Sequence, residues 1–199
     1  MTEAAHQMTA NPLPPGVRKP GSVGRGANVD VAIMDEKGNL LPTGRQGEVV
    51  VRGPNVTHGY HNNPEANAQA FTNGWFRTGD RGVLDAEGYL TLIGRIKELI
   101  NRGGEKISPL EVDAALLAHP AVAEVATFGA PDPKYGEEVH AAVVLKGEAT
   151  DTDLRAHCLK ALADFKVPKV IHLVKELPKG PTGKVQRRFL AGHFRSSGA

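Results

Sequence analysis

The sequence has little cysteine and no long apolar run. Its 199 residues include a single cysteine, Cys158, which excludes an internal disulfide framework and fits a reducing compartment. No window approaches the roughly 18 apolar residues that a membrane-spanning helix needs. The N-terminus lacks the basic and apolar segments of a secretory signal, and the last three residues differ from the peroxisomal address Ser-Lys-Leu. These absences favour a cytoplasmic protein, with a peroxisomal location left open.

Aromatic residues and unbalanced charge are also scarce. Aromatics make up 5% of the chain, so the core must be built from Val, Leu, Ile and Ala, and the 40% of hydrophobic residues is enough for one. The net charge of +2 is too small to predict nucleic-acid binding. A basic cluster formed by Lys184, Arg187 and Arg188 is short, and such a cluster is usually a solvated helix start.

The hydrophobic pattern of the first half is of β type. The first 28 residues are rich in Pro, Gly and Asn and show no periodicity. Strand-like alternation follows at 29–34, a second strand-like run at 47–52 reads Glu-Val-Val-Val-Arg from Glu48, and residues 82–93 have the pattern of a hairpin. A short helix is expected after Asn63, with Pro64 at its first position.

The second half alternates helices and strands. A helix is expected after Ser108, because Pro109 and Glu111 have the spacing of a helix start with a capping box. A further helix, capped by Asp151 or Thr152, has one apolar face. This face consists of Leu154, Cys158, Ala161, Leu162 and Phe165, which favours core packing over a nucleophilic role for the cysteine. Strand-like runs lie at 122–128, 139–145 and 170–174, before a short basic helix. The pattern predicts two small α+β units and not one parallel sheet.

Glycine-containing loops carry the polar residues that suggest chemistry. They cover residues 75–80, 94–106 and 178–184. Each loop alone is typical of a turn whose charges face water. None matches the Walker phosphate-binding pattern, because Gly180 lies too close to Gly183-Lys184.

The order of four motifs is more specific than any one loop. Thr-Glu at residue 2, Thr-Gly-Asp at 78, Gly-Arg-x-Lys-Glu at 94 and Thr-Gly-Lys at 182 together resemble the adenylate-forming superfamily, which includes acyl-CoA synthetases, luciferases and peptide-synthetase adenylation domains. The match runs from Met1 to about Phe194. It implies that residues 1–94 are the C-terminal part of the large AMP-binding domain, including its β-barrel subdomain. Residues 95–199 would be the mobile C-terminal domain, with a three-stranded sheet flanked by helices.

The resemblance also implies roles for individual residues around ATP. Thr2 matches a threonine that contacts the nucleotide phosphate, and Glu3 matches a glutamate that helps to hold Mg²⁺. Asp80 matches the aspartate that accepts hydrogen bonds from both ribose hydroxyls, and Arg95 an arginine that reaches the nucleotide. Lys184 matches the catalytic lysine, which bridges the acid's carboxylate and the α-phosphate as negative charge builds up.

A second group of residues matches the part of the family that moves. Lys97 matches a nucleotide-facing hinge, about which the C-terminal domain rotates between formation of the acyl-adenylate and formation of the thioester. Gly103 and Gly104 match the loop that then approaches the pantetheine arm of coenzyme A. Alone, Lys97 would be an ordinary exposed lysine.

Several segments resemble plant and fungal oxalate–CoA ligases, which are related to 4-coumarate–CoA ligases. They are residues 2–8, 53–57, 101–108 and 163–169. Oxalate is a dianion, so His6 is a candidate donor to its second carboxylate. A histidine satisfied by nearby backbone is the alternative.

Nothing in the chain matches the family's triphosphate loop. We therefore expect a fragment that is inactive alone and whose partner is the missing N-terminal domain. Two alternatives stay open: a ligase for 4-coumarate, a medium-chain fatty acid or another carboxylate, and a non-catalytic orphan lid or partner-binding module.

Overall fold

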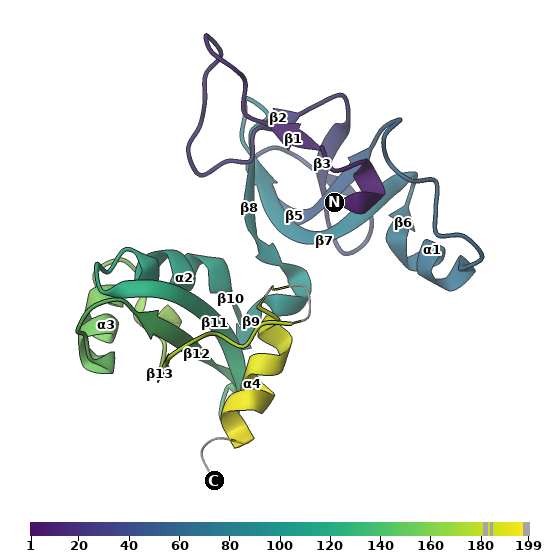
Figure 1. Ribbon diagram of the computed structural model, residues 1–199. Helices are drawn as coiled ribbons and strands as arrows, with labels where there is room; N and C mark the ends of the chain where they lie inside the picture. Colours follow the sequence, from purple (N-terminus) through teal and green to yellow (C-terminus); the bar gives the residue numbers. More distant parts are fainter. Residues whose placement is uncertain (181–182, 184, 197–199) are drawn as a thin grey trace. The chain divides into compact units, whose positions relative to one another are not determined.

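The computed structural model describes residues 1–180, 183 and 185–196. The chain divides into two compact units, Met1–Ile96 and Lys97–Ala199, which are described separately (Figure 1). Both combine strands with helices, which confirms the predicted α+β class. No helix in the described part of the chain is long and apolar enough to cross a membrane. The assignment of the two parts to the large and the C-terminal domain of the family stays a prediction.

The first unit is an antiparallel sheet with short additions. Its elements are η1 (Thr2–Ala4), β1 (Thr9–Ala10), β2 (Arg25–Gly26), β3 (Asp30–Met34), β4 (Leu40–Leu41), β5 (Gln46–Arg52), α1 (Pro64–Ala70), β6 (Phe71–Thr72), β7 (Trp75–Leu84) and β8 (Leu90–Arg95). The main sheet has the order β4-β3-β5-β7-β6, and β8 also pairs with β7. β1 and β2 form a separate pair. The ten-residue strand β7 therefore pairs with three other strands, β5, β6 and β8.

Alternation along β5 explains how this sheet is buried. Val49 and Val51 belong to apolar clusters on one side of the strand, and Val50 packs with Trp75 in another cluster. The predicted hairpin is present as β7 and β8. The predicted short helix is α1, where the Asn63 side chain accepts a hydrogen bond from the N–H of Ala66 at the N-terminus.

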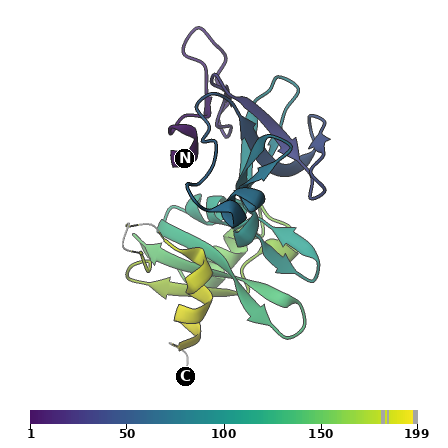
Figure 2. The same cartoon turned by 90° about the vertical axis from the view of Figure 1, so that its right-hand side faces the viewer.

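The second unit consists of a mixed sheet with helices on both faces. Its elements are η2 (Ile96–Glu98), which begins at the boundary, β9 (Ile100–Arg102), β10 (Glu105–Ile107), α2 (Pro109–Leu117), β11 (Val122–Asp132), β12 (Gly136–Leu145), α3 (Asp151–Cys158), η3 (Asp164–Lys166), β13 (Val170–Val174) and α4 (Arg187–Ser196). β12 pairs antiparallel with β11 and parallel with β13. Figures 1 and 2 show α4, in yellow, lying along the sheet.

The pleat of β12 separates the two cores of this unit. Val139, Ala141 and Val143 pack in the cluster that includes residues of α2 and α3, whereas Ala142 packs in the cluster that includes Leu190 of α4. The sheet has five strands and not the predicted three, because β9 and β10 add to it. These strands have three residues each, too few to show an alternating pattern.

Three local predictions for the second unit were wrong. The cap of α3 is Thr150 and not Asp151 or Thr152, and the helix ends at Cys158, so Phe165 lies in η3 and is 37% exposed. Cys158 itself is buried as expected. Arg187 does not lie at a solvated helix start: its side chain is 17% exposed and is held by buried partners.

Candidate functional site

Asp80 and Arg95 lie opposite each other on two paired strands. They are register partners in β7 and β8, and Arg95 Nε lies 3.1 Å from Asp80 Oδ1. The Asp80 side chain is 25% exposed and that of Arg95 is 63% exposed. The ion pair occupies one carboxylate oxygen, so the other can accept hydrogen bonds from a ligand.

The backbone around Asp80 is fixed by three hydrogen bonds. Thr78 Oγ1 donates to the carbonyl of Val49 at 2.8 Å and accepts the N–H of Asp80 at 3.1 Å. Gly79 has a φ of 73°, a conformation that favours glycine, and donates its N–H to Glu48 Oε1 at 3.0 Å. The Thr-Gly-Asp motif is therefore a rigid support for one carboxylate.

Glu48 is a functional neighbour that sequence reasoning missed. It is 9% exposed and bound by Arg77, whose Nε donates to Glu48 Oε2 at 2.9 Å and whose Nη2 also donates to it. Burial raises the pKa of Asp80; Arg95 opposes this shift, and the charge of Glu48 adds to it. A glutamate opening a strand-like run, Glu48–Arg52, was the available signal.

The segment that carries Thr2, Glu3 and His6 is clamped by the loop after β5. Asn55 Nδ2 donates to the carbonyls of Ala4 at 3.0 Å and Gln7 at 2.8 Å. His6 has a φ of 69°, and both it and Thr2 are exposed.

Glu3 is held by two further contacts with the same loop. Its carbonyl accepts the N–H of Thr57 at 2.7 Å, and its Oε1 accepts the hydroxyl of Tyr60 at 3.2 Å. Met8 and Thr9 continue this segment and share a cavity of about 150 Å³ with Asp80. The structure thus brings the N-terminal segment and the Thr-Gly-Asp motif to one region of the first unit.

Gly103 and Gly104 form the turn between β9 and β10. Their φ values are 57° and 97°. The N–H of Gly103 donates to the carbonyl of Tyr135 at 2.8 Å, and a Cβ at this position would approach the Tyr135 ring to 3.3 Å. Tyr135 in turn lies 4.0 Å from the guanidinium of Arg102. Glycine at position 103 therefore allows the backbone of the turn to lie close to the Tyr135 ring.

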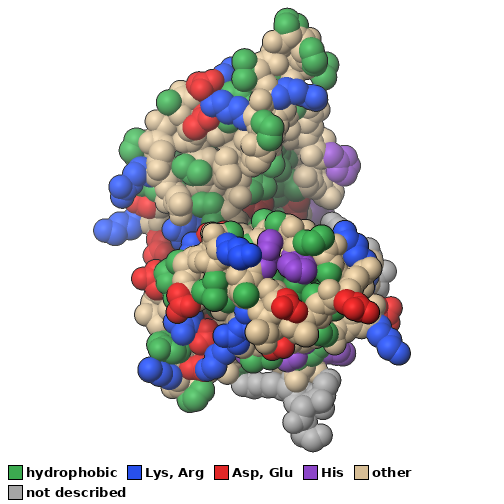
Figure 3. Space-filling model, turned by 90° about the vertical axis from the view of Figure 1, so that its left-hand side faces the viewer, with side chains coloured by type: hydrophobic (Ala, Val, Ile, Leu, Met, Phe, Trp, Pro, Cys, Tyr) green, Lys and Arg blue, Asp and Glu red, His purple; other side chains and the backbone are tan. Residues whose placement is uncertain are grey.

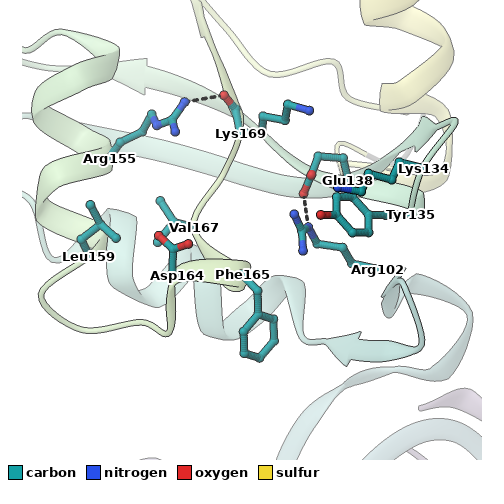
Figure 4. A pocket seen from close by; sticks show the side chains of 10 residues that line it. All are labelled: Arg102, Lys134, Tyr135, Glu138, Arg155, Leu159, Asp164, Phe165, Val167 and Lys169. Atoms are coloured by element: carbon teal, nitrogen blue, oxygen red, sulfur yellow. Dashed lines mark hydrogen bonds and ion pairs between the residues drawn. The ribbon is translucent and has the colours of Figure 1, made fainter.

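A basic, partly aromatic cavity of about 380 Å³ adjoins this turn (Figure 4). It is lined by Arg102, Lys134, Tyr135, Glu138, Arg155, Leu159, Asp164, Phe165, Val167 and Lys169. Four of these side chains are cationic and two are acidic. Sequence reasoning missed this cavity, because its cations come from four separate elements or loops.

One of the two acidic side chains of the cavity, Glu138, forms an ion pair with an arginine that also lines the cavity. Burial acts to raise the pKa of Glu138, but hydrogen bonds from Arg102, whose Nε lies 2.6 Å from Glu138 Oε1, and from the N–H of Val139 together hold the pKa below its usual value. Lys134, and secondly Arg102, lower the pKa of Tyr135. The arrangement can bind an anion that carries an aromatic ring. On the face drawn in Figure 3, by contrast, basic and acidic side chains are interspersed.

The remaining predicted residues lie in or near the second unit. Lys97 is exposed and is the first residue of that unit, directly at the division between the two. The catalytic prediction, Lys184, lies outside the described residues. Its described neighbours are fixed: Lys179 forms a β-bridge with Val185, and Gly183 N–H donates to the carbonyl of Gly180 at 2.9 Å.

Comparison with known proteins identifies the family. Residues 1–61 match the family model described as AMP-binding enzyme, and residues 111–184 match the AMP-binding enzyme C-terminal domain. The chain is 57% identical to oxalate–CoA ligase of Arabidopsis thaliana over 98% of its own length and 38% of the relative. The chain belongs to the adenylate-forming AMP-binding enzymes.

Further comparisons agree with this family. Oxalate–CoA ligase of Saccharomyces cerevisiae is 56% identical over 99% of the chain and 37% of the relative. Among solved structures, ATP-bound MatB from Rhodopseudomonas palustris has a TM-score of 0.90 and 38% identity, over 99% of this chain and 40% of that one. O-succinylbenzoate coenzyme A synthetase of Bacillus subtilis, in complex with ATP and magnesium ion, has a TM-score of 0.84 and 36% identity, over 94% and 39%. This AMP-binding enzyme chain thus spans about two fifths of the length of its relatives.

A magnesium ion bound to the first unit would need most of its ligands from a nucleotide or from water. The described residues contain no group of three or more His, Cys, Asp and Glu side chains able to hold a metal. Mg²⁺ in nucleotide enzymes is commonly held by one or two carboxylates together with substrate phosphates. The single carboxylate of Glu3 meets this requirement.

Proposed function

We propose that this chain is the C-terminal part of an acid–CoA ligase. The reaction converts a carboxylic acid, ATP and coenzyme A into an acyl-CoA, AMP and pyrophosphate through an acyl-adenylate. The observation that carries the proposal is the Asp80–Arg95 pair, set in register on neighbouring strands of a chain 57% identical to an oxalate–CoA ligase. Residues 1–94 would complete the AMP-binding domain, and residues 95–199 would form the mobile C-terminal domain.

The first unit would bind the nucleotide. Asp80 would accept hydrogen bonds from the two ribose hydroxyls, because an ionised carboxylate is a pure acceptor with two oxygens. Arg95 is exposed enough to reach the ligand while it remains beside Asp80. Thr2 would donate to a phosphate oxygen, and Glu3 would help to hold Mg²⁺, which neutralises phosphate charge.

The second unit would supply groups to each of two steps. In the first, a carboxylate oxygen of the acid attacks the α-phosphorus and pyrophosphate leaves, while the ammonium of Lys184 stabilises the growing negative charge. In the second, the thiolate of coenzyme A attacks the acyl carbon and AMP leaves. Rotation about Lys97 would exchange Lys184 for the turn at Gly103 and Gly104.

The basic cavity would hold the nucleotide end of coenzyme A. It adjoins the glycine turn through Tyr135, and coenzyme A combines phosphates with an adenine ring. Arg155 and Lys169 would face the phosphates, and the ring of Phe165 or Tyr135 would stack on adenine. In this chain, Lys169→Glu should abolish binding of coenzyme A measured by calorimetry, whereas Lys160→Glu, outside the cavity, should not.

The acid is proposed to be oxalate. The support is the identity to two oxalate–CoA ligases and the exposed imidazole of His6, which lies three residues after Glu3 in the chain. His6 would donate to the second carboxylate of the dianion. In a full-length ligase that contains this chain, His6→Ala should raise the KM for oxalate and leave the KM for ATP unchanged. An unchanged KM for oxalate would contradict the role of His6.

A chimera tests the function as a whole. This chain would replace the corresponding 38% of the Arabidopsis thaliana relative, and thioester formation would be measured with oxalate, 4-coumarate and a medium-chain fatty acid. We expect thioester formation with oxalate. A folded but inactive chimera would contradict the proposal, and it would favour the orphan lid or partner-binding module. Pyrophosphate exchange by the isolated chain is expected to be undetectable.

A further inference from the structure

We infer that Arg187 is a positioning residue that fastens the start of the second unit to the segment carrying Lys184. Resting on the proposed function, this inference gives a role to a residue that the sequence pattern had suggested was merely part of a solvated basic cluster. Arg187 is the first residue of α4 and lies three residues after Lys184. Its guanidinium contacts residues of three elements: η2, α2 and β11.

Three different atoms of Arg187 reach three partners. Nη2 lies 2.6 Å from Asp113 Oδ2 on α2, Nη1 donates to the carbonyl of Thr127 on β11 at 2.9 Å, and Nε lies 3.5 Å from Glu98 Oε2 in η2. Asp113 Oδ1 also accepts the N–H of Thr127 at 2.8 Å. A planar guanidinium with five donors can make all three contacts at once, which lysine cannot.

The Arg187–Asp113 pair is largely buried, unlike an ion pair on the surface. The side chains of Arg187 and Asp113 are 17% and 9% exposed, against 36% for Glu98. A buried arginine–carboxylate pair must keep its partners, because the loss of one leaves an uncompensated charge. The network therefore holds the base of α4 against α2 and β11, with Glu98 attached from the edge.

The network joins two segments that take part in the proposed reaction: η2 at one end and the start of α4 at the other. Glu98 follows Lys97, the proposed hinge, and Arg187 follows the loop whose base is closed by the β-bridge between Lys179 and Val185. A dihedral change at Lys97 would then carry Glu98 and Arg187 together. Arg187 thus connects the proposed hinge segment to the start of α4, three residues after Lys184 in the chain.

The first arm of the test measures hydrogen exchange in this chain. Glu98→Ala removes the outer contact without exposing the buried Asp113–Arg187 pair. We expect exchange at the amides of Lys179 and Val185 to rise about 10-fold, which is the size of a typical coupling between connected elements. Glu148→Ala, an exposed acidic residue elsewhere on the unit, should leave both amides unchanged. Unchanged exchange in Glu98→Ala would overturn the coupling.

The second arm uses the chimera and separates positioning from folding. Arg187→Gln should lower the rate of adenylate formation about 100-fold, as expected for a small misplacement of a catalytic group, and leave thioester formation from preformed acyl-adenylate unchanged. Arg188→Gln, at the exposed neighbour, should change neither rate. If Arg187→Gln unfolds the unit, the double variant Asp113→Asn/Arg187→Gln removes both buried charges and should show the same selective loss.

The outcomes of this arm distinguish the inference from the function on which it rests. Equal losses in both steps, or no loss in a folded variant, would overturn the positioning role. An inactive parent chimera would instead contradict the proposed function, and the exchange experiment would still decide whether Glu98 and Arg187 couple the two segments.

Discussion

The two units carry their candidate functional residues on different kinds of structure. In the first unit, Asp80 and Arg95 lie on paired strands, so their geometry is fixed by sheet register. In the second, Lys97 lies in the three-residue 3-10 helix η2, and Gly103 and Gly104 lie in the turn between β9 and β10. Under the proposed function, the comparison teaches that a site used in both steps suits a rigid sheet, whereas groups that are exchanged between steps suit short connections next to buried ion pairs.

Loss of the sheet-bound carboxylate is expected to have the largest effect. In the chimera, Asp80→Ala should raise the KM for ATP about 100-fold, because hydrogen bonds to a charged group contribute about 1.5–3 kcal/mol each. Steady-state kinetics at several ATP concentrations measure this. Asp30→Ala is the matched control: its exposed carboxylate lies on the same sheet, in an ion pair with Arg52. An Asp80→Ala variant with the parent KM would contradict the assignment.

Deeply buried carboxylates bound to an arginine occur in both units: Glu48 with Arg77 in the first, and Asp113 with Arg187 and Glu138 with Arg102 in the second. Glu48→Ala and Asp113→Ala should each reduce the free energy of unfolding by about 3–5 kcal/mol. Trp75 is the only tryptophan and lies in the first unit, so its fluorescence reports that unit alone.

Urea unfolding followed by fluorescence and by circular dichroism should therefore separate the two variants. Glu48→Ala should shift the fluorescence transition, and Asp113→Ala should leave that transition in place. If both variants shifted it equally, the two units would unfold as one, and the comparison between them would fail.

The reactivity of Cys158 provides a smaller test in the second unit. Burial raises the pKa of the thiol from 9.0 to about 11, two units, so the thiolate fraction at pH 8 falls about 100-fold. Labelling by a thiol reagent at pH 8 should be slower than for an unfolded control by at least this factor. Labelling of the folded chain at the unfolded rate would contradict the buried position.

The smallest expected effect concerns two histidines beneath α4. His140 Nδ1 lies 3.3 Å from His172 Nε2, and burial lowers the pKa of both. The charge of His172 and, more weakly, that of Lys169 also lower the pKa of His140, whereas Glu138 and Asp132 raise it. The folded state therefore binds fewer protons than the unfolded state, so the free energy of unfolding should fall as the pH drops below about 6.5.

Replacing one histidine tests this dependence. His172 stacks on Phe194, with ring centroids 4.3 Å apart, so His172→Phe keeps an aromatic ring at that place. The variant should lose part of the decrease in stability between pH 7 and pH 5, as measured by urea unfolding. An unchanged decrease would show that other groups cause it.

The sequence predicted most elements because their signals are local. Alternation identified β3, a run of valines identified β5, and the Ser108 and Asn63 positions marked the starts of two helices. The extra strands β9 and β10 and the early end of α3 were missed, since three-residue strands show no period and an apolar face can continue past a helix. The partners of Arg187 and the basic cavity depend on contacts between distant segments, which no local pattern contains.

The most direct test of the account compares both units in both steps. In the chimera, adenylate formation and thioester formation from preformed acyl-adenylate would be measured for Asp80→Ala and Lys184→Ala. The account predicts that Asp80→Ala slows both steps, whereas Lys184→Ala slows adenylate formation alone. Equal losses in both steps for Lys184→Ala, or a loss confined to one step for Asp80→Ala, would contradict it.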